Sequence, residues 1–397
     1  YLIGDINIRF DSEGNLKDDF IIKGFVKDTN LTLFKNYDLK KLNFVFNFNK
    51  DNFVFEDLRL AIDKLNFFSK KIIVKKLNGN FFVEGNFENK NVILDEKNII
   101  YFTKIFDPKF DLKKINFSSE NKFSFKVNKK FQVSQLEISS KVKIKDATIN
   151  NKINLKKIFP EIEDEINLLN NEMNFEYKKN FFSLKGSGDI LFQKKKDFIS
   201  YQLEKNKDDL IFKNLLKIDE GPFLLDFLNY KKNINDEKII KINEKINDNV
   251  FLLKSFSLNE GVNNIEINDL IIDKNNRIEK FNNITISYLD KDNEKNSLKI
   301  FKDKDYYMLK GDFFNADHLI ENILGENTKS NFFINNFRIR LNINKVRIDN
   351  DYQLDNLRGE LIFKNQKLFN ADLIGDFPDN KKVKFIVKSN GNNKVTT

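Results

Sequence analysis

The chain has 397 residues, of which 40% are hydrophobic and 32% charged, and this balance excludes a disordered chain and a bundle of membrane helices. It contains no cysteine, which excludes disulfides, thiolate metal sites and a cysteine nucleophile. The formal net charge of +9 suits an anionic partner, but the basic residues alternate with acids and asparagines, which disfavours nucleic acid. Because the strand-like pattern is already running at Tyr1, we expect a piece of a longer protein.

Alternation of apolar and polar residues is the main signal, and it predicts strands with one apolar face. Phe44, Phe46 and Phe48 alternate with polar neighbours, and the turn-like residues 49–52 lead into a second alternating run from Phe53. Similar strands or hairpins are predicted over residues 81–87, 123–133, 173–186, 337–343 and 357–363. The alternation changes phase between Val133 and Leu136, which predicts a β-bulge.

Few helices are predicted. Pro160 with Ile162, Ile166 and Leu169 indicates one amphipathic helix. A second is predicted from an Asn315 cap to Gly325, and a short third piece over residues 223–228. Residues 193–250 are richer in charge and less regular, so we predict two β-rich segments, 1–217 and 218–397, unless one continuous sheet runs through both.

The chemical inventory argues against an enzyme, and it predicts no cofactor and no metal. The single histidine, His318, has no partners that would form a triad or a metal site. Gly186-Ser187-Gly188 sits inside strand alternation, so it indicates close backbone packing or a bend and not a phosphate loop. Asp349, Asp351 and Asp355 lack the glycine of a calcium loop, since Leu354 occupies that position.

The apolar faces are the remaining functional feature, because a sheet with one apolar face must cover it. A few short helices cannot cover so many strands. Either a second sheet packs on the first as a phenylalanine-filled sandwich core, or the sheet curls around an apolar guest. The alternation by itself leaves both arrangements open.

The last part of the chain resembles a known family. The segment Gly311-Asp312-Phe313-Phe314-Asn315-Ala316-Asp317-His318-Leu319-Ile320 is similar to the Gly-Asp-x-Phe-Asp-Ala-x-x-Leu segment of bacterial AsmA-like proteins, in their YhdP-type branch. The long strand over residues 337–348, the hairpin residues 354–361 and the returning strand 369–375 resemble the same family. The motifs span roughly residues 300–390, and lysine, asparagine and phenylalanine replace the glycine and alanine that the family favours.

The resemblance implies an elongated, twisted antiparallel meander that forms a β-groove, in a periplasmic protein held to the inner membrane by an upstream helix. Its implied partner is phospholipid, whose acyl chains would move along the groove between the inner and outer membranes. Segments outside this chain would contact the two membranes. The resemblance does not identify other envelope proteins as partners. The sequence does not decide whether the odd-numbered or the even-numbered residues of each strand line the groove. The candidate groove residues are Phe44, Phe46, Phe48, Phe123, Phe125, Phe337 and Ile339.

Two other functions stay open at this point. A scaffold similar to TamB-like proteins would assist outer-membrane protein assembly by offering strand edges to its clients. A surface enzyme built on a β-solenoid would instead need convergent carboxylates, and no pair of acidic residues stands out in the sequence.

Overall fold

The structure is a computed structural model of the whole chain. It describes all residues except 16, 34–36, 63–64, 104–110, 152–155, 157, 208, 220, 226–227, 231–236, 248–249, 274–277, 318–335, 350, 365–366, 380, 391–392 and 397. The described residues are overwhelmingly β-strand in an open sheet, which confirms the mainly β, antiparallel fold class. In this part of the chain no helix is long and apolar enough to cross a bilayer.

The chain divides into two compact units. The first comprises Tyr1–Lys152, Asp164–Phe192 and Gln202–Lys207, and the second comprises Ile153–Glu163, Gln193–Tyr201 and Asp208–Thr397. The predicted boundary after residue 217 falls near the end of a strand of the second unit, Asp209–Ile218.

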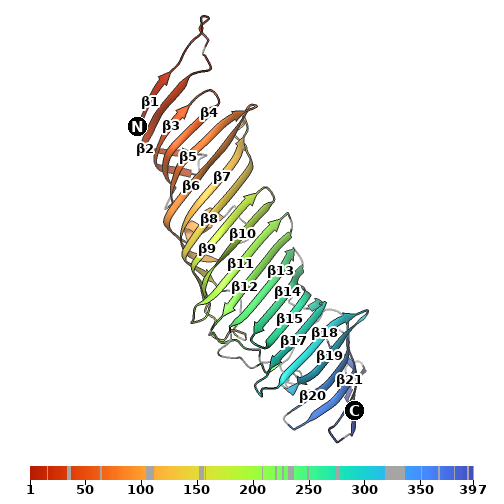
Figure 1. The fold of residues 1–397 in the computed structure, drawn as a ribbon. Helices are drawn as coiled ribbons and strands as arrows, with labels where there is room; N and C mark the ends of the chain where they lie inside the picture. The colour runs from red at the N-terminus through yellow and green to blue at the C-terminus, as the bar shows by residue number, and fades with distance from the viewer. Residues whose placement is uncertain are drawn as a thin grey trace. The chain divides into compact units, whose positions relative to one another are not determined.

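In the first unit every strand pairs antiparallel with the next one along the chain, as a meander (Figure 1). Its strands are β1 (Leu2–Asn7), β2 (Ile21–Leu33), β3 (Tyr37–Phe48), β4 (Asn52–Ile62), β5 (Leu65–Leu77), β6 (Asn80–Asp95), β7 (Leu112–Val127), β8 (Val133–Asn150), β9 (Glu165–Lys178) and β10 (Phe181–Leu191). Residues of β11 (Asp197–Asn206) belong partly to each unit.

The second unit is a meander with one parallel pair. Its strands are β12 (Asp209–Ile218), β13 (Lys238–Asn247), β14 (Val250–Glu260), β15 (Asn263–Asp273), β16 (Ile278–Lys280), β17 (Asn283–Leu289), β18 (Lys295–Asp303), β19 (Tyr306–Asn315), β20 (Phe337–Arg347), β21 (Gln353–Lys364), β22 (Lys367–Asp376), β23 (Lys382–Asn390) and β24 (Asn393–Thr396). Strands β19 and β20 run parallel, so that Tyr307 near the start of β19 pairs with Ile339 near the start of β20.

Asparagine and aspartate supply much of the backbone geometry that glycine usually provides. Among the described residues, fifteen non-glycine positions have positive φ, and ten of these are Asn or Asp. These two residue types tolerate the left-handed region best after glycine. Some of the ten lie in turns, as Asn180 does between β9 and β10, and others lie inside strands, as Asp57, Asn91 and Asn170 do. The asparagine-rich composition therefore has a structural role in a chain with only 14 glycines.

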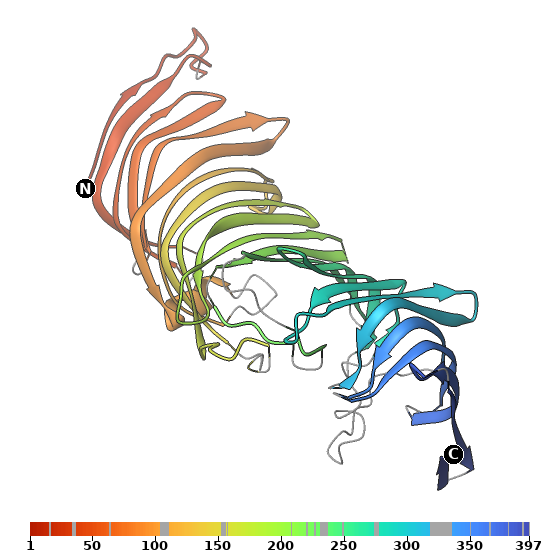
Figure 2. The ribbon, with the colours of Figure 1, turned by 60° about the horizontal axis from the view of Figure 1, so that its bottom comes forward.

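Most of the positive-φ residues inside strands mark β-bulges. Register shifts accompany Asn91 of β6 and Asn356 of β21, and the shift at Gln135 confirms the bulge predicted between Val133 and Leu136. A bulge bends its strand and moves the following side chains to the other phase of the alternation. Figure 2 shows the strands of the first unit bending along their length.

Polar side chains beside the bulges satisfy the backbone groups that the bulges leave unpaired. The side-chain amide of Asn171 donates to the carbonyls of Leu169 and Asp189, each at 2.9 Å. Asn89 donates to the Asn66 carbonyl at 2.6 Å, and the Ser118 hydroxyl accepts the Asn91 N–H at 3.0 Å. Asn89 and Asn171 are buried, so these hydrogen bonds remove a large desolvation cost.

One helix was missed by the sequence analysis. Helix α1 (Glu96–Thr103) follows β6, and the Asp95 carboxylate caps it by accepting the Asn98 N–H at 3.2 Å. Its Ile99 is 4% exposed and packs with Leu65, Val92 and Leu94 into a closed core. The Asp cap and the acidic first turn were the available signals.

Two predicted helices are corrected. Residues 158–161 form a turn, and Ile166 and Leu169 belong to β9, which pairs with β8. Their spacing of three matches a helix, but in a strand it places the two side chains on opposite faces. Residues 223–225 are irregular as well. The helix predicted from Asn315 to Gly325 lies almost wholly outside the described residues, although Asn315 itself ends β19.

The bulge at Asn91 gives a stability prediction. Asn91 is exposed, so replacing it changes mainly the backbone preference. We expect Asn91→Ala to lower the free energy of unfolding by about 1 kcal/mol and Asn91→Gly to lower it less or raise it. Asn86→Ala in the same strand, at ordinary φ, is the matched control. Equal effects of Ala and Gly at position 91, measured by urea unfolding, would contradict this role.

Candidate functional site

The predicted groove residues of β3 lie on one face of the sheet in the first unit. In an antiparallel ladder, directly paired residues share a face. Phe46 pairs with Gly24 of β2 and Phe55 of β4, and Phe48 pairs with Phe53. The rings confirm this arrangement: the Phe44 and Phe55 centroids are 5.5 Å apart, and those of Phe48 and Phe53 are 5.2 Å apart. Two neighbouring strands thus present a continuous aromatic surface.

The predicted residues of β7 extend the same surface. Phe123 pairs with Gly85 of β6, and Phe125 pairs with Val83. The Phe123 ring stacks on Phe87 at 5.2 Å and lies 5.9 Å from Phe125. The pairs Phe53–Val74 and Val74–Val83 join the β3 and β7 groups across β5, so they share one face, which we call the phenylalanine face. Phe53, Phe55, Phe81 and Phe87 belong to it although they were not among the predicted site residues.

Two glycines make room for the rings. A Cβ on Gly24 would lie 2.7 Å from Cζ of Phe46, and one on Gly85 would lie 3.0 Å from Cζ of Phe123. Each ring therefore lies over bare backbone of the neighbouring strand. This close approach flattens the phenylalanine face, because the rings lie along the sheet surface where a side chain at either glycine would push them away.

The phenylalanine face is not closed by a second layer within the described residues of its unit. Phe46 is 7% exposed, but Phe44, Phe48, Phe123 and Phe125 are only half-buried. Helix α1 covers the part of this face beyond the bulges, around Leu65 and Leu94.

The opposite face of the same strands carries charged and polar side chains together with apolar ones such as Val54, Ile73 and Phe82. Asn47 of β3 and Lys122 of β7 are exposed between the phenylalanines, and Lys75 forms an ion pair with Glu84 at 2.9 Å. The sheet of this unit therefore has one apolar, half-open face and one face on which charged, polar and apolar side chains are mixed.

The predicted residues of the second unit have a different environment. Phe337 is 6% exposed, and its ring stacks on Tyr307 at 4.6 Å and lies 6.0 Å from Phe281. Ile339 packs against the edge of this cluster, which also contains Leu253 and Leu270. In this unit the alternating residues interlock as a core, whereas Phe44, Phe46, Phe48, Phe123 and Phe125 of the first unit form the half-open face.

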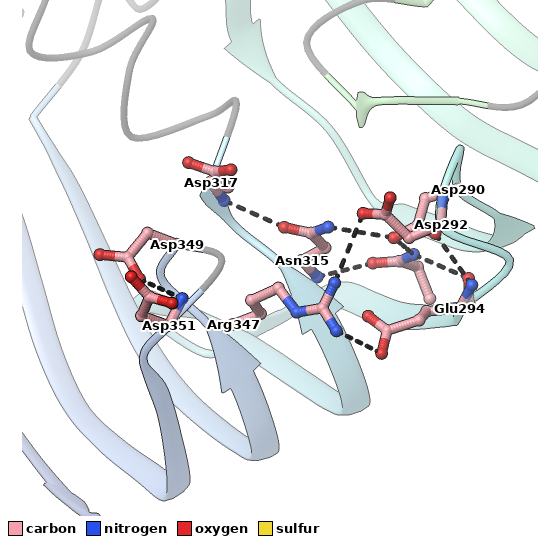
Figure 3. A network of polar contacts seen from close by, with 9 residues as sticks. Asp290, Asp292, Glu294, Asn315, Asp317, Arg347, Asp349 and Asp351 are labelled. Atoms are coloured by element: carbon pink, nitrogen blue, oxygen red, sulfur yellow. Dashed lines mark hydrogen bonds and ion pairs between the residues drawn. The ribbon is translucent and has the colours of Figure 1, made fainter.

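A buried polar network ties four strands of the second unit together (Figure 3). Asp290 is fully buried, and its carboxylate accepts N–H groups of Asp292 and Glu294 at 3.0 and 2.9 Å. It also accepts the side-chain amides of Asn296 and Asn315, both at 3.1 Å. With four donors satisfying it, Asp290 has no free capacity for a substrate and fastens the β17–β18 turn to the end of β19.

Arg347 extends this network to β20. Its guanidinium donates to Glu294 at 2.5 Å and to Asp292 at 3.4 Å (Figure 3). Asn315, from the segment that resembles AsmA-like proteins, therefore has a structural role at a junction of strands. Sequence reasoning missed Asp290 and Arg347, because their partners are up to 55 residues away.

The other residues considered from sequence have structural environments or lie outside the described chain. His318 lies outside the described residues. Asp349 accepts the N–H groups of Asp351 and Tyr352, both at 2.8 Å, and so shapes the turn between β20 and β21 (Figure 3). Gly188 confirms the predicted close packing, because a Cβ there would lie 2.6 Å from Asn171.

Burial raises the pKa of several side chains, including Tyr201 of the β11 strand and Glu244 of β13. Burial raises the pKa of the Tyr201 phenol to about 12. It also raises the pKa of Glu244, which pairs with Phe212 and Leu253 in an apolar row. Among the described residues no cluster of acids and histidines that could hold a metal ion is found, and desolvation is the cause of both pKa shifts.

Comparison with known proteins gives no relative: no family model, no curated protein and no solved structure matches this chain. The resemblance to AsmA-like proteins stays a prediction from the sequence motifs.

Removing the Asp290 carboxylate tests the buried network. Asp290→Ala leaves the Asn296 and Asn315 amides and two backbone N–H groups without their acceptor in a buried site. We expect it to lower the free energy of unfolding by about 3 kcal/mol or more. Asp292→Ala removes one exposed carboxylate of the same turn and is expected to cost about 0.5 kcal/mol. Similar losses for the two variants in urea unfolding would contradict this assignment.

Glu244 gives a pH-dependent prediction. The pKa of Glu244 is higher in the folded state than in the unfolded state. As pH rises, this carboxyl therefore ionises first in the unfolded chain, and the folded state loses stability above the unfolded-state pKa. We expect Glu244→Gln to be more stable than the natural chain at pH 7, and this gain to vanish as pH falls below about 4. Glu266→Gln is the control, since its carboxylate accepts the Asn264 amide. A gain that is the same at both pH values would refute desolvation as the cause.

Proposed function

We propose that this chain is a lipid-binding segment, and that the phenylalanine face of its first unit holds the acyl chains of phospholipid. One observation carries the proposal. The rings of β3, β4, β6 and β7 form a continuous apolar face that is half-buried and has no second sheet packed over it among the described residues of the unit. A face of this kind gains free energy when a hydrocarbon covers it.

The composition of the face favours an acyl chain over a polar ligand. Between Phe44 and Phe125 the face offers aromatic and branched aliphatic side chains, and the small residues Gly24 and Gly85 keep it flat. Each CH₂ group transferred from water to such a surface contributes about 0.8 kcal/mol. A chain of lipid length can therefore bind without a cofactor or a charged partner.

The wider proposal is that the chain is part of an envelope protein that carries phospholipid between the inner and outer membranes. It is supported by the motif resemblance around residues 311–320 and 354–361 and by the open meander of the first unit. In this proposal the polar opposite face, with Asn47 and Lys122, stays in water while the phenylalanine face carries hydrocarbon.

The test compares two substitutions that add one negative charge to neighbouring residues of β3. Phe48 lies on the phenylalanine face, and Asn47 lies on the opposite face, where it pairs with Lys23 and Val54. We expect native mass spectrometry of the purified full chain to detect bound phospholipid. We expect Phe48→Asp to weaken binding of a fluorescent phospholipid about tenfold or more, because an unpaired charge is costly in an apolar site. Asn47→Asp should leave binding unchanged.

Phe48→Leu guards against a folding artefact, because it shortens the side chain but keeps it apolar, and it should retain most of the binding. Absence of lipid from the purified chain, together with no uptake of added phospholipid, would refute the proposal. Crosslinking to unfolded outer-membrane protein strands without lipid uptake would favour the scaffold function instead.

A further inference from the structure

A cavity of about 600 Å³ opens on the first unit, away from the phenylalanine face. Its lining includes side chains from five successive strands: Asp28, Lys41, Arg59, Phe68, Glu88 and Lys90. Its volume lies within the range of small-molecule sites.

The register shows which face the cavity occupies. Phe67 packs into the core beneath helix α1, on the same side as Leu65 and Leu94. Phe68 is the next residue of β5, so its side chain points to the opposite face. Arg59 pairs with Phe68, and Phe68 pairs with Glu88, which places all three on this opposite face. These three side chains therefore lie on the face opposite the surface proposed to bind lipid, while Leu60 and Phe67, the residues next to Arg59 and Phe68, also border the cavity.

Three bulges produce the hollow. Asp28 of β2, Lys41 of β3 and Asp57 of β4 have positive φ at neighbouring positions of successive strands. The register shifts that accompany them lie between Val26 and Thr29, between Lys40 and Asn43, and between Asn43 and Val45. Because bulges bend each strand at the same level, the backbone is displaced there as a line and leaves a depression in the sheet surface.

The charged groups that line the cavity are not paired with one another in the described part of the chain. Among the described residues, no ion pair joins the cations Lys41, Arg59 and Lys90 to the carboxylates Asp28 and Glu88. The Arg59 guanidinium lies over the Phe68 ring, 5.7 Å from its centroid. Phe68 also separates Arg59 from Glu88, which lies two strands away at about 10 Å. The ring holds the guanidinium in place while its N–H groups stay available.

We propose that this cavity binds a phosphodiester group, with Arg59 as its principal donor and Lys41 and Lys90 beside it. Arginine presents a planar fork of donors that matches phosphate oxygens. Three cations against two carboxylates leave a formal excess of one positive charge, which suits a monoanion and disfavours polyphosphates. The aromatic floor at Phe68 accommodates the organic substituents of a diester, which inorganic phosphate lacks.

The experiment measures binding to the full chain by titration calorimetry with glycerophosphoglycerol, a soluble phosphodiester. A second arm measures co-sedimentation with vesicles that contain phosphatidylglycerol. Binding of the soluble probe assigns the site to free phosphodiesters, whereas binding in the vesicle arm alone assigns it to a lipid headgroup; either result supports the proposal if it depends on Arg59. We expect Arg59→Gln to weaken binding about tenfold or more, and Arg59→Lys to weaken it less.

Lys90→Gln provides a second test if the Arg59 variants fold poorly, and it should weaken binding severalfold. The matched control is Lys141→Gln, an exposed lysine of β8 outside the cavity, which should change neither arm. No binding of either probe at millimolar concentration, or equal binding by the natural chain, Arg59→Gln and Lys90→Gln, would overturn the proposal. Phospholipid binding at Phe48 is expected to survive Arg59→Gln, so this proposal and the proposed function can fail independently.

Discussion

The fold depends on one constraint: residues that pair across an antiparallel ladder point to the same face of the sheet. In the first unit the chain repeats hairpins in which phenylalanine or a branched aliphatic residue occupies alternate positions, so pairing gathers them onto one face. Phe46 beside Gly24 and Phe55, and Phe123 beside Gly85, are direct consequences of that register. A slip of one residue in any strand would move its rings into the polar face, and this penalty keeps the register fixed.

Bulges divide each long strand of this unit into two parts with different roles. On one side of the bulges the phenylalanine face is half open, and on the other side Leu65, Val92 and Leu94 are closed beneath Ile99 of helix α1. The same bulges create the charged cavity around Arg59 on the opposite face. The β-bulges, most of which have asparagine or aspartate at positive φ, thus shape both candidate binding surfaces.

The two units use the same alternation for different purposes. In the second unit Phe281, Tyr307 and Phe337 interlock as a core near the starts of β19 and β20, and the Asp290 network fastens the opposite ends of these strands. In the first unit helix α1 covers only one part of the sheet, and the rings of Phe44, Phe48, Phe123 and Phe125 stay half-buried. The same alternation of phenylalanines therefore gives a closed core in one unit and a half-open face in the other. The proposed lipid function rests on the first unit for this reason.

The sequence by itself determined the mainly β class, most hairpins, the bulge near Gln135 and the shared face of Phe44, Phe46 and Phe48, because a period of two is a local property that pairing preserves. It did not determine whether a face stays open or closes, and Phe337 and Phe48 look alike in sequence. It also missed helix α1 and misassigned β9, since Ile166 and Leu169 fit a helix until β8 pairs with them. The Asp290 network and the cavity at Arg59 were decided only by tertiary structure. Their members come from strands far apart in the chain, and only the register of the sheet brings them to one place.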